Sequence, residues 1–375
     1  MKLPSHFAGR ICALALASFS VPANAQLAKN SCKYLGNIIT NQVPADFNNY
    51  WNQATPENSG KWTSIQSSVK STSYSWSGFD VVYNWGKTTG NPVKFHTLVW
   101  GSAQPSGASS ATIEDIQRWF QAVHDRYPDL AQIDVVNEAF PNHAPPQYRG
   151  VLKTAAAADG IPESEYDWIF EAFMMARKLW PDANKTKLIY NDFNTIEYDT
   201  EHKWQVAMCK LAKEQKIPID AIGLQAHDVY KLSTSSVKAK IDAIAATGFP
   251  LYITEYDISE TDDTKQKNIM AEQMTMFWNH ISIKGVTYWG LRDGQTWRTG
   301  TGIFTSTGAL RPSMQWLKDW IPAAEGSCYS HIEERPGVAE SPAHPGLIVR
   351  SLDGRLETGV ERNGQFTGVN ALGQN

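Results

Sequence analysis

Two glutamates, Glu138 and Glu255, each lie in a short apolar run of the sequence, at residues 133–138 and 251–256. Cleavage of a glycosidic bond needs one carboxylic acid to protonate the leaving oxygen, and a second carboxylate to attack the anomeric carbon or activate water. Carboxyl groups about 5–5.5 Å apart would retain the configuration of that carbon, whereas a gap of about 6.5–9.5 Å would invert it. The two glutamates therefore predict a glycosidase, and the gap decides its stereochemistry.

The sequence neighbours of the two glutamates indicate separate roles. Asn137 precedes Glu138 and can hydrogen-bond a sugar 2-hydroxyl, while Asp257 follows Glu255 by two residues and so shares its face of a strand. His227 could bridge Asp257 and Glu255, which would keep Glu255 ionised as a nucleophile requires. A nearby carboxylate and partial burial would keep Glu138 protonated. A lone histidine is more often structural, but in this group of residues we interpret His227 as functional.

Other polar and aromatic residues lie late in further apolar runs. They are His96 and Trp100 in residues 93–100, Asn191 and Asp192 in 188–193, Gln225 and His227 in 221–227, and Trp289 in 285–291. Turn formation alone would favour Asn, Asp and Gly at strand ends rather than Glu, His and Gln. Parallel strands of a barrel point their carboxyl ends to one face, where active sites form. The pattern predicts that these side chains meet on one rim.

The elements that must position these residues are eight apolar runs alternating with helical patterns. The runs are residues 34–40, 50–56, 93–100, 133–138, 188–193, 221–227, 251–256 and 285–291, and the helical segments include 113–127, 165–180, 200–215, 237–246 and 265–280. Strands that alternate with helices predict parallel βαβ units. Eight such units predict an α/β fold, a (β/α)8 TIM barrel, which needs about 250 residues.

The first 25 residues are typical of a signal peptide. Lys2 and Arg10 precede or flank an apolar run at 11–21 that is too short to span a bilayer, and Ala23-Asn24-Ala25 matches the small-x-small cleavage pattern. We expect cleavage after Ala25 and a secreted protein, extracellular or periplasmic. The predicted domains are the signal peptide at 1–25, a catalytic barrel at 26–330, and a tail at 331–375. The tail has little helical or strand periodicity and is interpreted as flexible or non-native.

The cysteines give one predicted crosslink. Cleavage would leave Cys32, Cys209 and Cys328, and export permits disulfides. Cys32 precedes the first predicted strand and Cys328 follows the last predicted helix. Because the two ends of a closed barrel meet, we predict a Cys32–Cys328 disulfide. Cys209 lies in an apolar helical pattern and is predicted to be a buried free thiol.

The composition argues against several kinds of partner. The net charge of −4 gives no basic patch for nucleic acid or an anionic membrane. The 14 tryptophans offer flat faces that can stack on sugar rings. The histidines lack metal-ligand spacing such as HExxH. We therefore expect a monomer with no metal, no cofactor, no nucleic-acid partner and no membrane contact.

Seven motifs, in order over most of residues 32–320, resemble those of family 10 glycoside hydrolases, a xylanase family of barrel fold. They are TPEN followed by Lys61-Trp62, HTLVW at 96–100, DVVNEA at 134–139, NDFN at 191–194, IGLQAH at 222–227, ITEYD at 253–257, and TYWG at 287–290 with the segment 293–297. Each motif alone is weak, whereas the set in this order is highly specific.

The resemblance implies an endo-1,4-β-xylanase that hydrolyses internal bonds of xylan and xylooligosaccharides by a retaining double displacement. Glu138 would be the acid/base and Glu255 the nucleophile, supported by Asp257. The residues around the cleaved sugar would be Lys61, His96, Trp100, Asn137, Gln225 and His227, with Glu57 and Asn58 binding the next sugar toward the non-reducing end. Trp289 and Trp297 would roof the site and crowd the hydroxymethyl group that glucose carries and xylose lacks, a preference worth about 1–3 kcal/mol.

Departures from the family pattern fall on the leaving side. Gly101 to Gln104 replaces the family's HSQ, Gly107 replaces the tryptophan of PSW, and Phe193 replaces the common tyrosine of NDYN. These changes affect the leaving-side subsites rather than the reaction. Other interpretations remain: a barrel glycosidase acting on another β-1,4-glucan or on aryl glycosides, a transglycosylase, or a non-catalytic glycan-binding barrel, which the presence of both carboxyl groups disfavours.

Overall fold

The computed structural model describes residues 26–40 and 42–324, together with four strand segments between residues 339 and 368. The chain divides into two units, residues 1–326 and 327–375. The predicted signal peptide and Cys328 lie outside the described residues.

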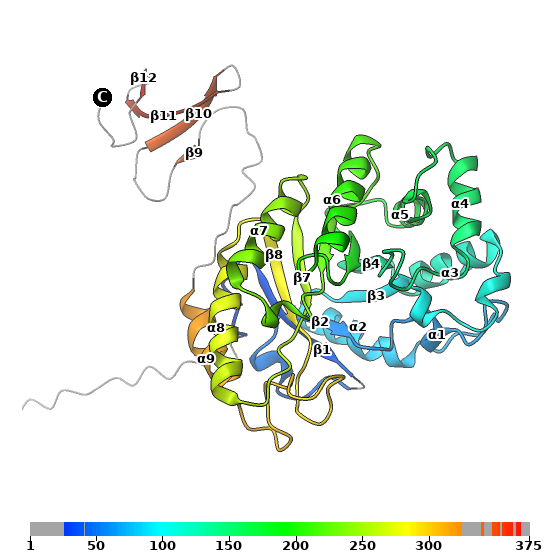
Figure 1. Ribbon diagram of the computed structural model, residues 1–375, viewed down its shortest axis with the longest axis horizontal. Helices are drawn as coiled ribbons and strands as arrows, with labels where there is room; N and C mark the ends of the chain where they lie inside the picture. Colours follow the sequence, from blue (N-terminus) through cyan, green and yellow to red (C-terminus); the bar gives the residue numbers. More distant parts are fainter. Residues whose placement is uncertain are drawn as a thin grey trace, which may run out of the picture. The chain divides into compact units, whose positions relative to one another are not determined.

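Eight parallel strands form one sheet in the first unit (Figure 1). They are β1 (Tyr34–Ile39), β2 (Gln53–Pro56), β3 (Lys94–Val99), β4 (Gln132–Asn137), β5 (Lys187–Asp192), β6 (Ala221–Leu224), β7 (Leu251–Tyr256) and β8 (Ile283–Tyr288), in the order β2-β1-β8-β7-β6-β5-β4-β3. The seam between β2 and β3 is held by the Ala54–Val93 bridge and a 3.2 Å bond from Ala54 N to Pro92 O. The predicted (β/α)8 barrel is confirmed.

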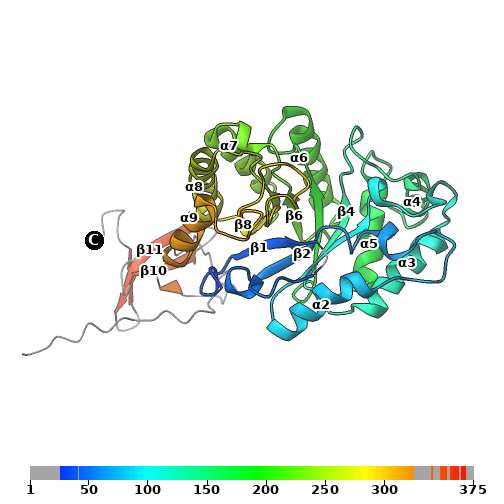
Figure 2. The same ribbon diagram turned by 90° about the horizontal axis from the view of Figure 1, so that it is seen from below.

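Helices cover the outside of the strands (Figures 1 and 2). They are α1 (Trp62–Ile65), α2 (Ser77–Thr89), α3 (Ile113–Arg126), α4 (Arg149–Ala158), α5 (Asp167–Leu179), α6 (Asp199–Glu214), α7 (Thr234–Ala245), α8 (Asp263–Asn279) and α9 (Pro312–Trp320), with short 3-10 turns at Phe47–Asn49, Gly101–Ala103, Ala108–Ser110, Val229–Lys231 and Ile321–Ala323. The sequence analysis did not identify α1, α2 or α4. In α4 only Leu152 and Ala156 are buried, so its apolar stripe is too narrow to stand out from periodicity.

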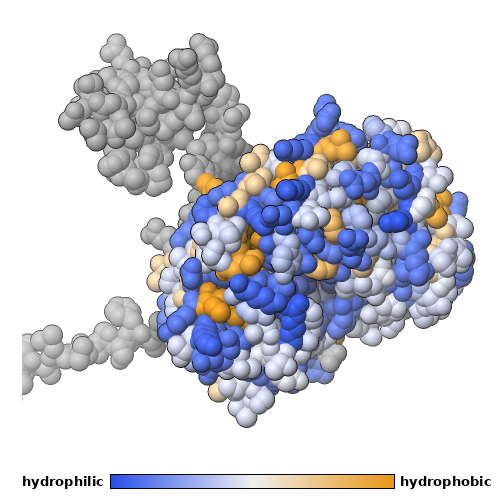
Figure 3. Space-filling model, viewed as in Figure 1, coloured by the Kyte–Doolittle hydropathy of each residue, from blue (hydrophilic) through white to orange (hydrophobic). Residues whose placement is uncertain are grey.

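Most of the tryptophans belong to the core. Trp51, Trp62, Trp119, Trp180 and Trp278 are fully buried. The rings of Trp62 and Trp119 stack with centroids 5.2 Å apart. The face drawn in Figure 3 is largely hydrophilic, with hydrophobic residues in small separate patches. Abundance of tryptophan is therefore mainly a packing feature of this barrel, and only a few tryptophans remain for binding.

The cysteines agree with the prediction as far as the described residues reach. Cys209 is a buried free thiol in α6, as predicted. Cys32 is disulfide-bonded. Its predicted pairing with Cys328 lies outside the described residues and stays a prediction.

The second unit holds a small antiparallel sheet that the sequence analysis did not anticipate. Its strands are β9 (Ala339–Glu340), β10 (Leu347–Leu352), β11 (Arg355–Arg362) and β12 (Gln365–Gly368), in the order β12-β11-β10-β9. The sequence carried a signal for it, because Asp-Gly at 353–354 and Asn-Gly at 363–364 separate these runs. Such dipeptides between strand-like runs are typical of β-hairpins.

In the described part of the chain, no helix is both long and apolar enough to span a bilayer.

Candidate active site

Most of the predicted rim residues line a cleft of about 470 Å³ at the carboxyl ends of the strands, whereas Asn191 and Asp192 do not line it. Its lining comprises Glu57, Asn58, Lys61, His96, Trp100, Glu138, Phe193, Asn194, Gln225, His227, Asp228, Glu255, Trp289, Trp297 and Arg298. Asn137 and Asp257 do not line this cleft but lie buried behind it. The structure therefore brings together all the residues that the sequence analysis assigned to the site.

Backbone hydrogen bonds continue past the strands and fix the rim. Glu138 N donates to Asn191 O at 2.9 Å, and Glu255 N donates to Gln225 O at 3.2 Å. Glu138 adopts a left-handed backbone with φ of 57°, which is uncommon for a residue other than glycine. Ala144 N donates to the Glu138 carbonyl at 3.1 Å. These bonds from two neighbouring segments hold the sparsely populated conformation, a pattern typical of functional residues.

Glu255 is buried and held as a carboxylate. Asn191 Nδ2 donates to its Oε1 at 2.8 Å, and His227 Nε2 lies 3.2 Å from its Oε2. Burial alone would raise the pKa of Glu255, but the hydrogen bond from His227 and the positive charges of His96, His227 and Lys94 outweigh it and lower the pKa to about 2. Glu255 is therefore ionised at neutral pH.

His227 bridges two carboxylates, as the sequence analysis predicted. Its Nδ1 lies 3.1 Å from Asp257 Oδ2, opposite the contact to Glu255. Burial would lower the pKa of His227, yet Asp257 and Glu255 together raise it to about 10. Both ring nitrogens are then protonated and donate. Trp297 Nε1 also donates to Asp257 Oδ2 at 2.7 Å, so the predicted roof residue Trp297 and His227 contact the same carboxylate oxygen.

Glu138 is held in the opposite protonation state. Burial raises its pKa to about 7, with further contributions from the negative charges of Glu255 and Asp192. Trp100 Nε1 donates to its Oε2 at 2.8 Å and Gln225 Nε2 donates to its Oε1 at 3.2 Å, and both bonds oppose the rise. Glu138 therefore keeps its proton through a neutral or mildly acidic range, as a general acid needs.

A chain of amide side chains links the two glutamates. Gln225 Nε2 lies 3.3 Å from Asn137 Oδ1 as well as reaching Glu138. Asn191 Nδ2 donates to the same Asn137 oxygen at 2.8 Å and to Glu255. The sequence analysis placed Asn191 at a strand end but gave it no role. Its position in NDFN, a motif otherwise made of rim residues, was the available signal.

Arg298 and Asp228 are further lining residues that the sequence analysis missed. Arg298 donates to Asp228 Oδ1 at 2.9 Å and packs over the Trp297 ring at 4.1 Å. The guanidinium therefore packs against a face of the Trp297 indole. Only the position of Arg298 directly after Trp297 hinted at this contact.

The glycine at position 101, in the segment after β3 that departs from the family pattern, is explained by the residues around it. A side chain at Gly101 would meet the carbonyl oxygens of Ala144 and Pro145 at 2.5 Å, and Gly101 N donates to Ala144 O at 2.9 Å. Gln104 Oε1 accepts from Gln147 N at 3.0 Å. The loop after β4 thus occupies the space that a larger residue at position 101 would need, and Gln104 anchors that loop.

Phe193 lines the cleft and rests on another ring. Its ring stacks on His143 with centroids 3.6 Å apart, and His143 Nδ1 lies 2.7 Å from Asp192 Oδ1. Stacking on His143 therefore holds the ring of Phe193 in place, although Phe193 lacks the hydroxyl group of the tyrosine that is common in the family.

A buried ion pair supports His96 from inside the barrel. Lys94 Nζ lies 2.9 Å from Asp134 Oδ2, and both side chains are fully buried. The approach lacks hydrogen-bond geometry, so the contact is an ion pair rather than a directed bond. His96 Nδ1 lies 2.8 Å from the same oxygen, which fixes the ring beside the cleft.

We expect Lys94→Met to lower the free energy of unfolding by about 3–5 kcal/mol, because it leaves the Asp134 carboxylate buried beside His96 alone. Lys87→Met is the matched control, since Lys87 pairs with Asp129 on the surface. That change should cost less than about 1 kcal/mol. Denaturant unfolding at neutral pH measures both, and equal losses would contradict the assigned role of the buried pair.

Comparison with known proteins finds a family match that covers most of the chain. The profile of glycosyl hydrolase family 10 matches residues 23–319. Endo-1,4-beta-xylanase B of Cellvibrio japonicus (strain Ueda107) is 39% identical over 291 residues, covering 76% of this chain and 45% of that protein. Beta-1,4-xylanase of Dictyoglomus thermophilum is 29% identical over 272 residues, covering 66% and 73%. The chain therefore spans less than half of the Cellvibrio protein.

Solved structures share the fold. Native xylanase 10B from Thermotoga maritima superposes with a TM-score of 0.69 at 22% identity, over 80% of this chain and 98% of that one. Xylanase 10B from Thermotoga petrophila RKU-1, solved in complex with xylobiose, gives a TM-score of 0.68 at 22% identity, over 80% and 97%. At this identity the likeness establishes the barrel fold alone.

Proposed function

Because this chain belongs to glycosyl hydrolase family 10, we propose that it is an endo-1,4-β-xylanase that hydrolyses internal bonds of xylan and xylooligosaccharides with retention of configuration. The observation that carries the proposal is the opposite protonation of the two glutamates on one rim. Burial holds the pKa of Glu138 at about 7, and His227 with other cations holds that of Glu255 at about 2. The curated relatives named above are xylanases, which supports the substrate class.

The first step joins the enzyme to the sugar. A carboxylate oxygen of Glu255 attacks C1 of the bound xylose, the bond from C1 to the bridging oxygen breaks, and the proton of Glu138 passes to that oxygen. Asn191 and His227 orient Glu255 from both of its oxygens. The leaving sugar chain departs as an alcohol, and a glycosyl ester on Glu255 remains.

The second step releases the sugar. Glu138, now a carboxylate, takes a proton from water, and the water oxygen attacks C1 as the ester bond to Glu255 breaks. Two displacements at one carbon restore its original configuration. Trp100 and Gln225 then stabilise Glu138 as an anion by donating to it.

The glycone side of the cleft is assigned to Glu57, Asn58 and Lys61. Lys61 Nζ donates to Asn58 Oδ1 at 2.8 Å and lies 4.9 Å from the centre of the Trp100 ring. The carboxylate of Glu57 and the amide of Asn58 suit the hydroxyl groups of a second sugar, with the Lys61 ammonium group beside the sugar being cleaved. Trp289 lines the cleft, so its bulk would crowd a hydroxymethyl group on the bound sugar, which supports xylose over glucose.

Proton NMR of the first products from xylooligosaccharides tests the mechanism, because new β-anomer before mutarotation means retention. New α-anomer would overturn the retaining assignment. Carboxymethyl cellulose is the parallel substrate, and equal turnover of it would overturn the substrate assignment. Products longer than the starting oligosaccharide at high substrate concentration would instead indicate transglycosylation through the same ester.

The pH dependence of kcat/KM should be bell-shaped. Glu138 must be protonated in the free enzyme, so activity should fall as pH rises through about 7. Glu255 must be ionised, so the acid limb should appear only as pH falls toward about 2. Trp100→Phe removes a donor that lowers the pKa of Glu138, so it should move the alkaline limb to higher pH. A shift to lower pH would contradict this assignment.

The proposal extends to export of the chain as a monomer. The N-terminal pattern at residues 1–25 supports cleavage after Ala25. N-terminal sequencing of secreted protein should then begin at Gln26, and light scattering should give one chain per particle. Retention of the first 25 residues would overturn the export assignment.

A further inference from the structure

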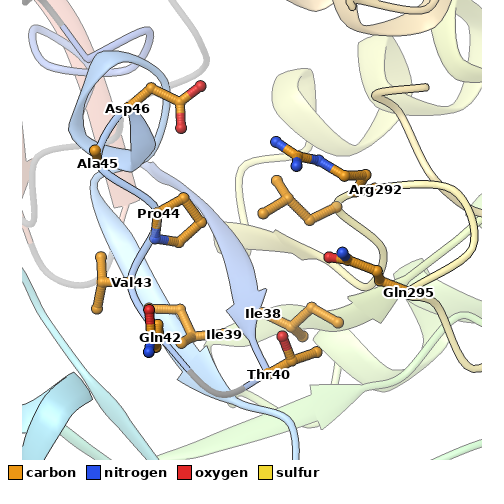
Figure 4. Close-up of a pocket in the computed structure, with 11 residues that line it drawn as sticks. Ile38, Ile39, Thr40, Gln42, Val43, Pro44, Ala45, Asp46, Arg292 and Gln295 are labelled. Atoms are coloured by element: carbon orange, nitrogen blue, oxygen red, sulfur yellow. The ribbon is translucent and has the colours of Figure 1, made fainter. Parts of the chain in front are cut away.

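A second cavity, larger than the catalytic cleft, lies between the segment after β1 and the segment after β8 (Figure 4). Its volume is about 820 Å³. Part of its wall is apolar and comes from Ile38, Pro44 and Leu291. The catalytic residues do not reach it, so the proposed reaction leaves it without a role.

This cavity adjoins the glycone side of the cleft. Ile39 lines the cavity, and its carbonyl accepts from Glu57 N at 2.9 Å. Gln295, on the opposite wall, precedes the roof residue Trp297 by two positions. Glu57 and Trp297 both line the catalytic cleft. The cavity therefore lies beside the end of the cleft that Glu57 lines.

Arg292 carries the only positive charge on the cavity wall among the described residues. Its side chain is half-buried, and within the described part of the chain its guanidinium makes no hydrogen bond or ion pair. By contrast, Arg298 and Arg311 from the same region are each paired with an aspartate. A partly desolvated guanidinium without a partner favours an anion, and its planar fork matches a carboxylate.

The rest of the wall narrows the choice of anion. Asp46 and Arg292 project from opposite sides of the cavity (Figure 4). The Asp46 carboxylate would repel a phosphate or another highly charged ion, but it can accept from hydroxyl groups. The apolar wall suits the carbon–hydrogen faces of a pyranose ring. A sugar acid offers all three features: one carboxylate, several hydroxyl groups and an apolar face.

We propose that this cavity binds a uronic acid branch of the xylan chain, with Arg292 pairing with its carboxylate. The inference rests on the proposed xylanase function, because the chain in the cleft delivers the branch. Arg292 would then determine which branched substrates are favoured without taking part in bond cleavage.

The test compares three substrates: linear xylohexaose, glucuronoxylan, and the same glucuronoxylan after chemical reduction of its carboxyl groups to primary alcohols. Arg292→Gln should lower kcat/KM on glucuronoxylan by about tenfold or more, the effect of losing a hydrogen bond to a charged group. Activity on the two uncharged substrates should be unchanged. Arg292→Lys should lose less, and Arg149→Gln, an exposed arginine outside the cavity, should lose nothing.

The outcomes separate the two proposals. No hydrolysis of xylohexaose by the wild type would overturn the xylanase function itself. Normal hydrolysis of xylohexaose, with equal Arg292→Gln and wild-type rates on glucuronoxylan, would overturn only the branch site. Equal losses on the charged and reduced polymers would also overturn it. Free glucuronate in excess distinguishes a free sugar acid from a branch of the polymer as the ligand. If free glucuronate binds at Arg292 but Arg292→Gln hydrolyses glucuronoxylan as fast as the wild type, the branch assignment is wrong.

Discussion

Glu255→Gln should lower kcat on xylan by roughly 10⁴-fold or more, a loss of the size found when a nucleophile is removed. The amide keeps the volume and can still contact Asn191 and His227, so the fold should survive. It cannot form the glycosyl ester, because its neutral oxygen is a weak nucleophile. Steady-state hydrolysis of xylohexaose measures the loss.

Glu57→Gln is the matched control, since Glu57 is another carboxyl group in the same cleft. It should weaken substrate binding while leaving most of kcat, because no covalent bond forms there.

Azide added to Glu255→Ala gives a second test of the nucleophile. The anion fills the space of the missing carboxylate and attacks the sugar once, giving an α-glycosyl azide. A β-azide from this variant would show that Glu255 is not the nucleophile.

The catalytic pair could be predicted from the sequence because its signals are local. Glu138 and Glu255 each lie at or next to the end of an apolar run, and the parallel strands of a barrel bring such ends together whatever the loops do. Asp257 was placed beside Glu255 by the two-residue period of a strand. His227 lies beside Glu255 and Asp257 because β6 and β7 are neighbours in the sheet.

The residues that support the catalytic glutamates could not be predicted from the sequence, because their contacts depend on how the strands pair and on where distant loops lie. Lys94 and Asp134 are 40 positions apart, and only the pairing of β3 with β4 brings Asp134 opposite His96. A lysine inside an apolar run was a visible anomaly, but its partner was not. The requirement for Gly101 was equally hidden, since the clash that it avoids comes from residues 144 and 145.

Helix α2 and the strands of the tail sheet were missed for a different reason. In α2 the buried residues Phe79, Val82 and Trp85 do recur at helical spacing, but Gly86 and two threonines follow them and weaken the helical pattern. The tail strands alternate apolar and polar residues over only short runs. Their clearest signals are the Asp-Gly dipeptide at 353–354 and the Asn-Gly dipeptide at 363–364, which are typical of hairpin turns rather than of barrel strands.

Glu138→Gln should give the second large loss, and its size should depend on the leaving group. On xylan, where the departing alkoxide needs a proton, kcat/KM should fall by roughly 10²–10⁴-fold. On an aryl xyloside with an acidic phenol, the first step needs no proton and should stay near the wild-type rate. The second step still lacks its base, so a burst of phenol followed by slow turnover is expected.

This dependence separates a lost acid from a damaged site. A misfolded variant, or one that binds sugar poorly, would lose activity on both substrates alike and would show no burst. The ester on Glu255 should accumulate and appear in intact mass spectra as one added glycosyl unit. In Glu138→Ala, which leaves space where the carboxyl group was, azide should attack the ester from that side and give a β-glycosyl azide, the opposite anomer to the Glu255→Ala product. The alkaline limb near pH 7 should also disappear from the first step, since the group whose pKa is about 7 is gone. Retention of that limb would assign it to a group other than Glu138.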